Sequence, residues 1–155
     1  METICGFRAE SWARFMRDAQ AVAREIRPDA VMFLNGGGFS SHNLALAYDA
    51  ARLESFQTFT GSEQFFHCAD GYDSPYKTLN LARFLSAGKN PGVVFTHHGL
   101  STWHYTPLPS AEMTTALAQT VAGGSNTWFA VFHEALKTDA TEALAPLETA
   151  GRFIA

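Results

Sequence analysis

Short apolar runs alternate along the chain with longer segments that have helical periodicity. Apolar residues recur at helical spacing over residues 11–26, and Pro28 follows at a point where a helix cannot continue, so we predict a helix there. The run over residues 30–34 is short and continuously apolar and is followed by three glycines, 36–38, which predicts a buried strand ending in a turn. A weaker apolar pattern over residues 52–56 predicts a second strand.

The middle of the chain has a helix and then the strongest strand signal. Ser74 as N-cap and Pro75 at the first helical position begin a predicted helix that ends at Gly88. The run GVVFTHH over residues 92–98 follows, and its continuous apolar character predicts a buried strand.

The last third of the chain repeats this order. A third helix is predicted from its cap Ser110 to Gly123, and the run TWFAVFH over residues 127–133 follows as another strand. A last helix is predicted from Pro146 to the end. Strands that alternate with helices indicate the α/β class, with a parallel sheet of about four βα units. Since a closed (β/α)8 TIM barrel takes roughly 250 residues, four units resemble one half of such a barrel, here a single partial barrel domain over residues 1–155.

The predicted strands end on side chains that can take part in chemistry. Because the carboxyl ends of parallel strands meet at one edge of a sheet, we expect these side chains to lie close together although they are far apart in the sequence. They are Asn35, Glu54, the neighbours His97 and His98, and His133.

Glu54 is the candidate catalytic residue in this set. A carboxyl group buried at a strand end can keep its proton and act as a general acid. The alternative is a structural ion pair with an arginine such as Arg52 or Arg83. Glu63, in the stretch TGSEQFF, is a second candidate carboxylate, but its setting is more typical of a solvated loop.

The histidines and the loop after the strongest strand suggest ligand binding. Successive strand residues point to opposite faces, so only one of His97 and His98 can face a site. Trp103 and Tyr105 follow in the next loop, and such aromatic side chains suit the apolar face and the hydroxyl rim of a sugar. We expect no metal and no cofactor, because the six histidines show no metal-ligand spacing.

Composition narrows the classes of partner. The 155 residues carry a formal net charge of -4, which gives no basic stripe for nucleic acid and no cationic face for a membrane surface. Charged residues interrupt the first fifteen positions, so we expect no signal peptide and a cytoplasmic location. Two isolated cysteines do not suffice for a disulfide framework.

The longer motifs resemble a known family. The stretches REIRPDAVMFLNGGG, SPYKTLNLARFL with GVVFTHHGLSTWHY, and SAEMTTALAQTVAGGSNTWFAVFH look like the C-terminal half of bacterial glycosyl hydrolase TIM barrels related to α-L-fucosidases and β-galactosidases. The resemblance implies a carbohydrate substrate. It also implies that a first half of the barrel, with a strand carrying a catalytic aspartate, precedes the part of the domain seen here. The isolated chain would then lack one catalytic carboxylate.

The sequence therefore predicts a glycoside hydrolase-like domain in which Glu54 acts as acid or base and the other strand-end residues bind the sugar. Two alternatives stay open, namely a non-catalytic sugar-binding or structural module and a metal-dependent hydrolase built on the histidines. A half barrel leaves unpaired strands at both sides of its sheet, so we also expect self-association through exposed sheet edges.

Overall fold

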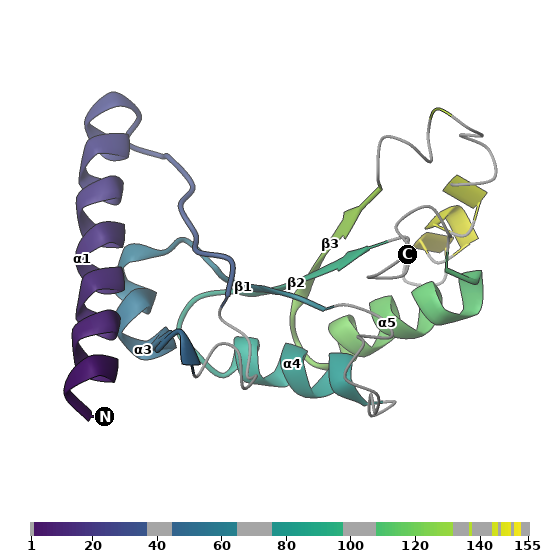
Figure 1. Ribbon diagram of the computed structural model, residues 1–155. Coiled ribbons are helices and arrows are strands. Elements are labelled where there is room, and N and C mark those ends of the chain that lie inside the picture. Colours follow the sequence, from purple (N-terminus) through teal and green to yellow (C-terminus); the bar gives the residue numbers. More distant parts are fainter. Residues whose placement is uncertain are drawn as a thin grey trace.

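A three-stranded parallel sheet with helices packed on one face organises the molecule (Figure 1). The computed structural model describes residues 2–36, 45–64, 76–97 and 108–131, together with 137, 144–145, 147–149 and 151–152 near the C-terminus. The elements in chain order are α1 (Glu2–Ile26), α3 (Ala50–Leu53), the 3-10 helix η1 (Glu54–Phe56), β1 (Thr60–Glu63), α4 (Lys77–Ser86), β2 (Gly92–His97), α5 (Ser110–Ala122) and β3 (Asn126–Ala130).

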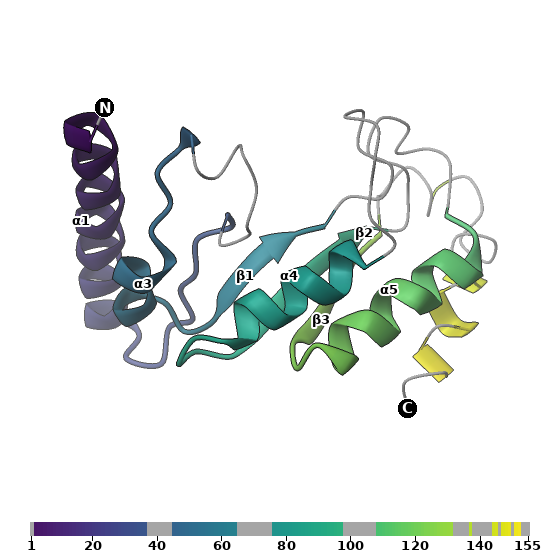
Figure 2. The ribbon, with the colours of Figure 1, turned by 90° about the horizontal axis from the view of Figure 1, so that it is seen from below.

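The sheet has the order β1-β2-β3, and both pairs of neighbours run parallel. Helices α4 and α5 cover one face of it, as the view from below shows (Figure 2). Val94 of β2 packs there against Leu81, Ala82 and Leu85 of α4. A second apolar cluster joins Met113 and Leu117 of α5 with Leu108, and Phe129 of β3 packs against it. The core therefore lies between the sheet and these two helices.

The predicted α/β class with a parallel sheet is confirmed. The half-barrel of four βα units is not confirmed, because the described part of the chain forms three strands. Strand β2 begins where the sequence predicted it, and β3 overlaps its predicted range. The segment over residues 30–34 is extended but forms no regular strand; next to it, Asn35 makes one isolated parallel bridge with Gly61 of β1.

The predicted strand over residues 52–56 is wrong. These residues form α3 and η1 instead, and the Asp49 side chain caps α3 by accepting a hydrogen bond from the Arg52 amide. The strand of this region is β1, eight residues further along. Its sequence TGSE has no apolar side chain, although its first three residues are buried. β1 is therefore a strand because it pairs with β2 and is buried by neighbouring elements, and it has no apolar run that would reveal it in the sequence.

The helices largely follow the predictions. Helix α5 begins at Ser110 and ends before Gly123, as expected, although Ser110 is its first residue and Pro109 occupies the cap position. Helix α4 begins at Lys77, while the predicted cap Ser74 lies outside the described residues. Helix α1 extends nine residues further toward the N-terminus than predicted. Residues 147–149 and 151–152, within the predicted last helix, are helical.

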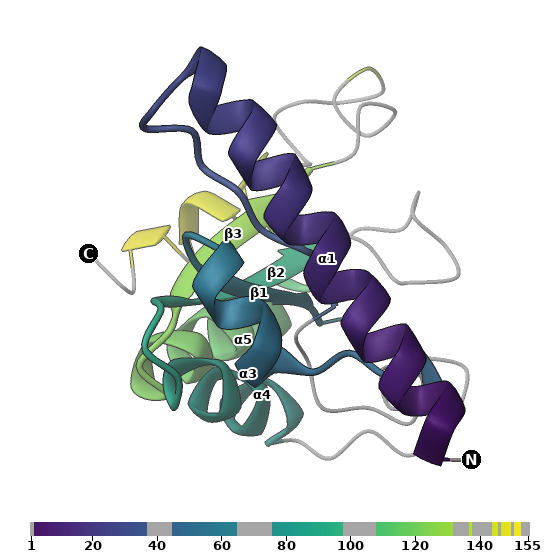
Figure 3. The ribbon, with the colours of Figure 1, turned by 90° about the vertical axis from the view of Figure 1, so that its left-hand side faces the viewer.

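Helix α1 lies on the outside of the molecule, beside α3 (Figure 3). Arg52 of α3 forms an ion pair with Glu10 of α1 at 3.2 Å, and the Trp12 ring lies 5.2 Å from the Tyr48 ring. Arg8 donates a hydrogen bond to the Ala45 carbonyl. These contacts fix α1 to the segment that precedes β1. No helix in the described ranges combines the length and the apolar character needed to cross a membrane.

Candidate functional site at the carboxyl edge of the sheet

Glu63 and His97 meet at the carboxyl edge of the sheet. Each is the last residue of its strand, Glu63 in β1 and His97 in β2. Because the two strands are parallel neighbours, their ends lie side by side, and Glu63 Oε1 is 3.7 Å from His97 Nε2. The Glu63 side chain is 38% exposed and the His97 side chain 11%, so solvent reaches the carboxylate more easily than the imidazole. The two groups form an ion pair when His97 is protonated.

An aromatic surface continues from this pair across the same face of the sheet. The strand register aligns Glu63 with Phe95 and Phe95 with Trp128, so the three residues form one row. The Phe95 and Trp128 rings meet edge to face with centroids 5.0 Å apart. Trp128 is 51% exposed. A carboxylate and a half-exposed indole therefore flank Phe95 on the face that α4 and α5 do not cover.

Two further rings support this surface from the segment that precedes β1. Phe33 stacks on Phe59 with centroids 4.4 Å apart, and it also lies 5.3 Å from Phe95 and 5.8 Å from Trp128. Gly61 leaves the space that Phe95 fills, because a Cβ atom on Gly61 would come within 2.5 Å of the Phe95 ring. Phe33 thus packs against both Phe95 and Trp128, and Phe59 packs against Phe95.

Asn35 lies beside β1 and not at its end. Its isolated bridge pairs it with Gly61, two residues before Glu63, and the Gly36 amide donates to the Gly61 carbonyl. Asn35 is exposed. The structure thus places Asn35 next to the strand that carries Glu63, close to the predicted edge but on the outer side of β1.

Glu54 lies at the other edge of the sheet, so the prediction that it ends a strand is wrong. Its carboxylate accepts hydrogen bonds from the backbone amides of Lys89 and Asn90, which precede β2. The Asn90 side chain donates in return to the Glu54 and Gln57 carbonyls. Residue 90 lies seven positions before His97, roughly 20 Å along an extended chain. Glu54 therefore fastens the amino end of β2, and this geometry gives no support to a role as catalytic acid.

The alternative for Glu54, an ion pair with Arg52 or Arg83, is not found among the described residues. Among the described residues its partners are backbone amides, and Arg52 pairs with Glu10 and Asp49 instead. The remaining predicted ligand-binding residues lie outside the described residues. They are His98, Trp103, Tyr105 and His133.

Two residues of the site were undervalued in the sequence. Glu63 was interpreted as a loop residue because TGSE lacks an apolar run. Trp128 lies in an apolar strand, which favours a core position, yet it faces the open side and is 51% exposed. Alternation along β3 carries a usable signal, since Phe129 packs into the core and Trp128 must then point the opposite way.

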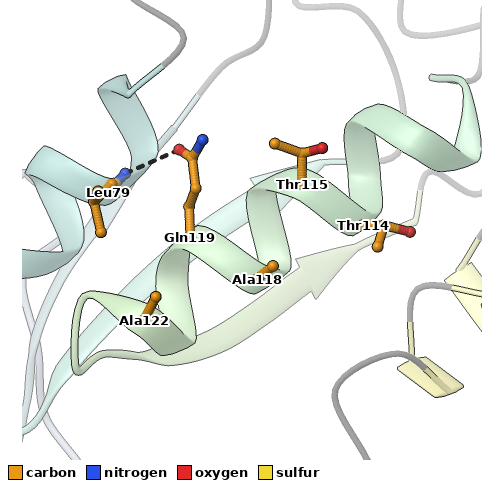
Figure 4. Close-up of a pocket in the computed structure, with 6 residues that line it drawn as sticks. All are labelled: Leu79, Thr114, Thr115, Ala118, Gln119 and Ala122. Atoms are coloured by element: carbon orange, nitrogen blue, oxygen red, sulfur yellow. Dashed lines mark hydrogen bonds between the residues drawn. The ribbon is translucent and has the colours of Figure 1, made fainter.

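A concavity lies between α4 and α5, away from the carboxyl edge of the sheet. It has a volume of about 440 Å³, and Leu79, Thr114, Thr115, Ala118, Gln119 and Ala122 line it (Figure 4). The Gln119 side chain accepts a hydrogen bond from the Leu79 amide there. No titratable side chain lines this groove, so it offers no acid, base or nucleophile.

The described residues contain no group of three or more His, Cys, Asp or Glu side chains that could hold a metal ion. The chain matches no family model, no curated protein and no solved structure. The described residues that form the candidate site are therefore Glu63, His97, Phe95 and Trp128.

Proposed function

We propose that the carboxyl edge of this sheet is one side of a carbohydrate-processing site of the glycoside hydrolase type. The observation that carries the proposal is the Glu63–His97 pair, 3.7 Å apart at the ends of two parallel strands, with Trp128 half exposed in the same row. Ligands of parallel α/β sheets bind at this edge. The family resemblance of the sequence motifs points to the same substrate class.

Each group has a role that follows from its chemistry. The Glu63 carboxylate is accessible enough to approach a glycosidic oxygen or a sugar hydroxyl. His97, more buried, lies 3.7 Å from the carboxylate and changes its charge environment when it is protonated. Trp128 offers the flat apolar surface on which the C–H face of a pyranose packs.

Glycoside cleavage requires two carboxyl groups about 5 to 9.5 Å apart, one of them acting as acid. Glu63 supplies one. We accordingly expect the chain to bind sugars, with hydrolysis depending on a second carboxylate.

Sugar binding is tested by titrating the full chain with monosaccharides while recording tryptophan fluorescence. Binding at the edge changes the Trp128 signal, so Trp128→Phe reduces the response while Trp12→Phe, on α1, retains it. A response that survives Trp128→Phe and disappears with Trp12→Phe contradicts the proposed site.

Glu63→Gln tests the carboxylate against the matched surface variant Glu25→Gln on α1. We expect Glu63→Gln to weaken monosaccharide binding at least tenfold and Glu25→Gln to leave it unchanged. With chromogenic aryl glycosides, any hydrolysis falls by a factor on the order of 100 or more in Glu63→Gln. If sugars bind and no aryl glycoside is hydrolysed, the site is a sugar-binding module, which is the first alternative.

The second alternative, a metal-dependent hydrolase, is tested by metal analysis of protein purified without chelators. The described residues supply at most Glu63 and His97 as neighbouring ligands, which is fewer than a catalytic zinc site uses. We expect less than stoichiometric zinc, manganese or iron. A stoichiometric metal that is lost in His97→Ala would replace the carbohydrate proposal.

A further inference from the structure

Helix α1 carries apolar residues on two opposite sides. One side is buried against the rest of the molecule through Ala9, Ala13, Met16 and Gln20. The other side is exposed and is called here the outer stripe. Its members are Ile4, Phe7, Phe15, Val22 and Ile26, with exposures between 58% for Phe15 and Val22 and 85% for Ile26. At 100° per residue, the outer stripe lies roughly opposite the buried side.

The outer stripe is larger than packing within this chain requires. A helix on the surface of a domain needs one apolar side, and the buried side of α1 already provides it. Five large apolar side chains lie exposed on the opposite side, with Ser11 and Asp18 between them, and exposed apolar patches of this kind mark interaction surfaces. Because α1 lies on the outside of the molecule, a second helix can reach the outer stripe along its length (Figure 3).

We propose that the outer stripe pairs with the outer stripe of a second copy of this chain, with the two α1 helices antiparallel. The stripe is nearly symmetric about Phe15. Ile4 and Ile26 lie eleven positions on either side of it, and Phe7 and Val22 lie eight and seven positions away. An antiparallel pair centred on Phe15 therefore sets Phe15 against Phe15 and Ile4 against Ile26 of the second copy. Such a self-complementary surface is what a two-fold dimer uses.

The charges beside the outer stripe fit the same arrangement. Arg14 and Asp18 are both exposed; Arg14 lies beside the outer stripe, and Asp18 lies within it between Phe15 and Val22. In the antiparallel pair, Arg14 of one copy lies about 3 Å, measured along the helix axis, from both Asp18 and Arg14 of the second copy, so that two contacts of opposite charge outweigh one contact of like charge. The two-fold axis creates the contact between Arg14 and Asp18 twice. Asp18 also accepts a hydrogen bond from Arg17 at 3.3 Å, which leaves its second carboxylate oxygen for the dimer contact. These pairs contribute orientation more than affinity.

The contact is small, and this sets the expected affinity. The stripe runs from residue 4 to residue 26, about 33 Å of helix. A single pair of helices lies at the low end of specific interface sizes, so the dimer is reversible with a dissociation constant on the order of micromolar. The inference does not depend on the carbohydrate site, since α1 carries no residue of that site.

Sedimentation velocity of the full chain over a concentration series tests the pairing. Val22→Lys interrupts the outer stripe, and Val121→Lys makes the same change at a similarly exposed valine of α5 (58% and 54% exposed). We expect a concentration-dependent dimer in the wild type and in Val121→Lys, and at least a tenfold weaker dimer in Val22→Lys. A wild type that is monomeric throughout, or a dimer equally strong in Val22→Lys, overturns the proposal.

Charge reversal and cross-linking test the antiparallel direction. Arg14→Asp weakens the dimer by a factor of about three or more, and Arg14→Asp combined with Asp18→Arg restores it. In a background with Cys5→Ser and Cys68→Ser, Ile4→Cys protein mixed with Ile26→Cys protein forms disulfide-linked dimers under oxidation. Efficient cross-linking of Ile4→Cys with itself indicates a parallel pair and overturns the antiparallel arrangement.

Discussion

Glu54 connects two segments of the chain that are more than thirty residues apart in the sequence. Its carboxylate accepts hydrogen bonds from the backbone amides of Lys89 and Asn90, and the Asn90 side chain donates to the carbonyls of Glu54 and Gln57. This reciprocal set joins the segment before β1 to the residues before β2. Removing the Glu54 carboxylate leaves the Lys89 and Asn90 amides without this acceptor, and removing the Asn90 side chain leaves the Glu54 and Gln57 carbonyls without this donor.

We therefore expect Glu54→Ala to lower the free energy of unfolding by about 1 to 3 kcal/mol, because a lost partner leaves backbone amides unsatisfied. Asn90→Ala has a similar effect. Urea denaturation followed by circular dichroism measures the change, and Glu25→Ala, on the exposed side of α1, is the control, within about 0.5 kcal/mol of wild type. Glu54→Ala should leave sugar binding intact. If it abolishes sugar binding at unchanged stability, Glu54 has a functional role after all.

Asp29 gives a titration that NMR can follow directly. A hydrogen bond from the Arg27 side chain, and after it a backbone hydrogen bond, lower the pKa of Asp29 below its usual value of 3.8. The Arg27 guanidinium donates to both carboxylate oxygens, at 2.9 and 3.4 Å. Because the pKa is lower in the folded state, the interaction favours folding above the unfolded pKa and is lost as the pH falls through the folded one.

Replacing Arg27 with Gln should move the pKa of Asp29 back toward the usual value. Carbon-detected NMR of the carboxyl group during an acid titration measures both values. Equal pKa values for Asp29 in the two proteins would show that the contact with Arg27 is absent in solution.

At the scale of elements, the contact between β1 and Phe95 is the most sensitive point of the candidate site. Gly61 has no side chain, and a Cβ atom there would meet the Phe95 ring at 2.5 Å. Gly61→Ala should lower the free energy of unfolding by about 1 to 3 kcal/mol, since the ring has to shift within a packed surface. It should also change the Trp128 emission, because Trp128 packs edge to face on Phe95.

Gly6→Ala is the control for that substitution, since a Cβ atom at Gly6 would meet no atom within 4 Å. Because Gly6 lies within α1, alanine there should stabilise the helix by about 0.5 to 1 kcal/mol. Tryptophan emission spectra and urea denaturation of the two variants provide the comparison. Unchanged emission in Gly61→Ala would show that Phe95 and Trp128 move independently.

The elements that the sequence predicted well have an unambiguous local pattern. The strand over residues 92–97 begins with four continuously apolar residues, and the helix from Ser110 has both a periodic apolar side and a glycine stop. The region over residues 50–63 had neither. Helix α3 has four residues, too few for a period to emerge, and β1 is buried by its neighbours although its own side chains are small or polar.

The candidate site could be predicted from the sequence in part. His97 was found because it ends the strongest strand. Glu63 was undervalued because its strand gives no local signal, and only the pairing of β1 with β2 brings it to His97. The role of Glu54 depends on the loop before β2, a contact across more than thirty residues that no pattern in the sequence encodes.

For the whole molecule, the sheet predicts an order of local stability. Strand β2 has a partner on both sides and α4 on one face, whereas α1 contacts α3 and η1 at one end of the chain. Native-state hydrogen exchange should therefore find the slowest amides in β2 and faster opening in α1. Raising the protein concentration should slow exchange in α1 as the dimer forms. Uniform protection of both elements at low concentration would contradict this order.

Self-association through sheet edges stays a prediction. Strand β3 pairs with β2 on one side, and among the described residues its other side has no strand. Pairing at that edge and pairing through α1 differ in a measurable way, because Val22→Lys acts on α1 alone. Local patterns in the sequence predicted the α/β class. They did not predict the number of strands, which is three among the described residues.

The alternation along β2 has a consequence for how this protein can change over evolution. Val94 and Thr96 face the helices, while Phe95 and His97 face the other side together with Glu63 and Trp128. Inherited substitutions at position 97 can thus change the candidate site while the helix-facing positions keep the scaffold. A single-residue deletion within the strand exchanges the two sets and loses both at once. Lineages of this chain should accordingly preserve the length of the strand.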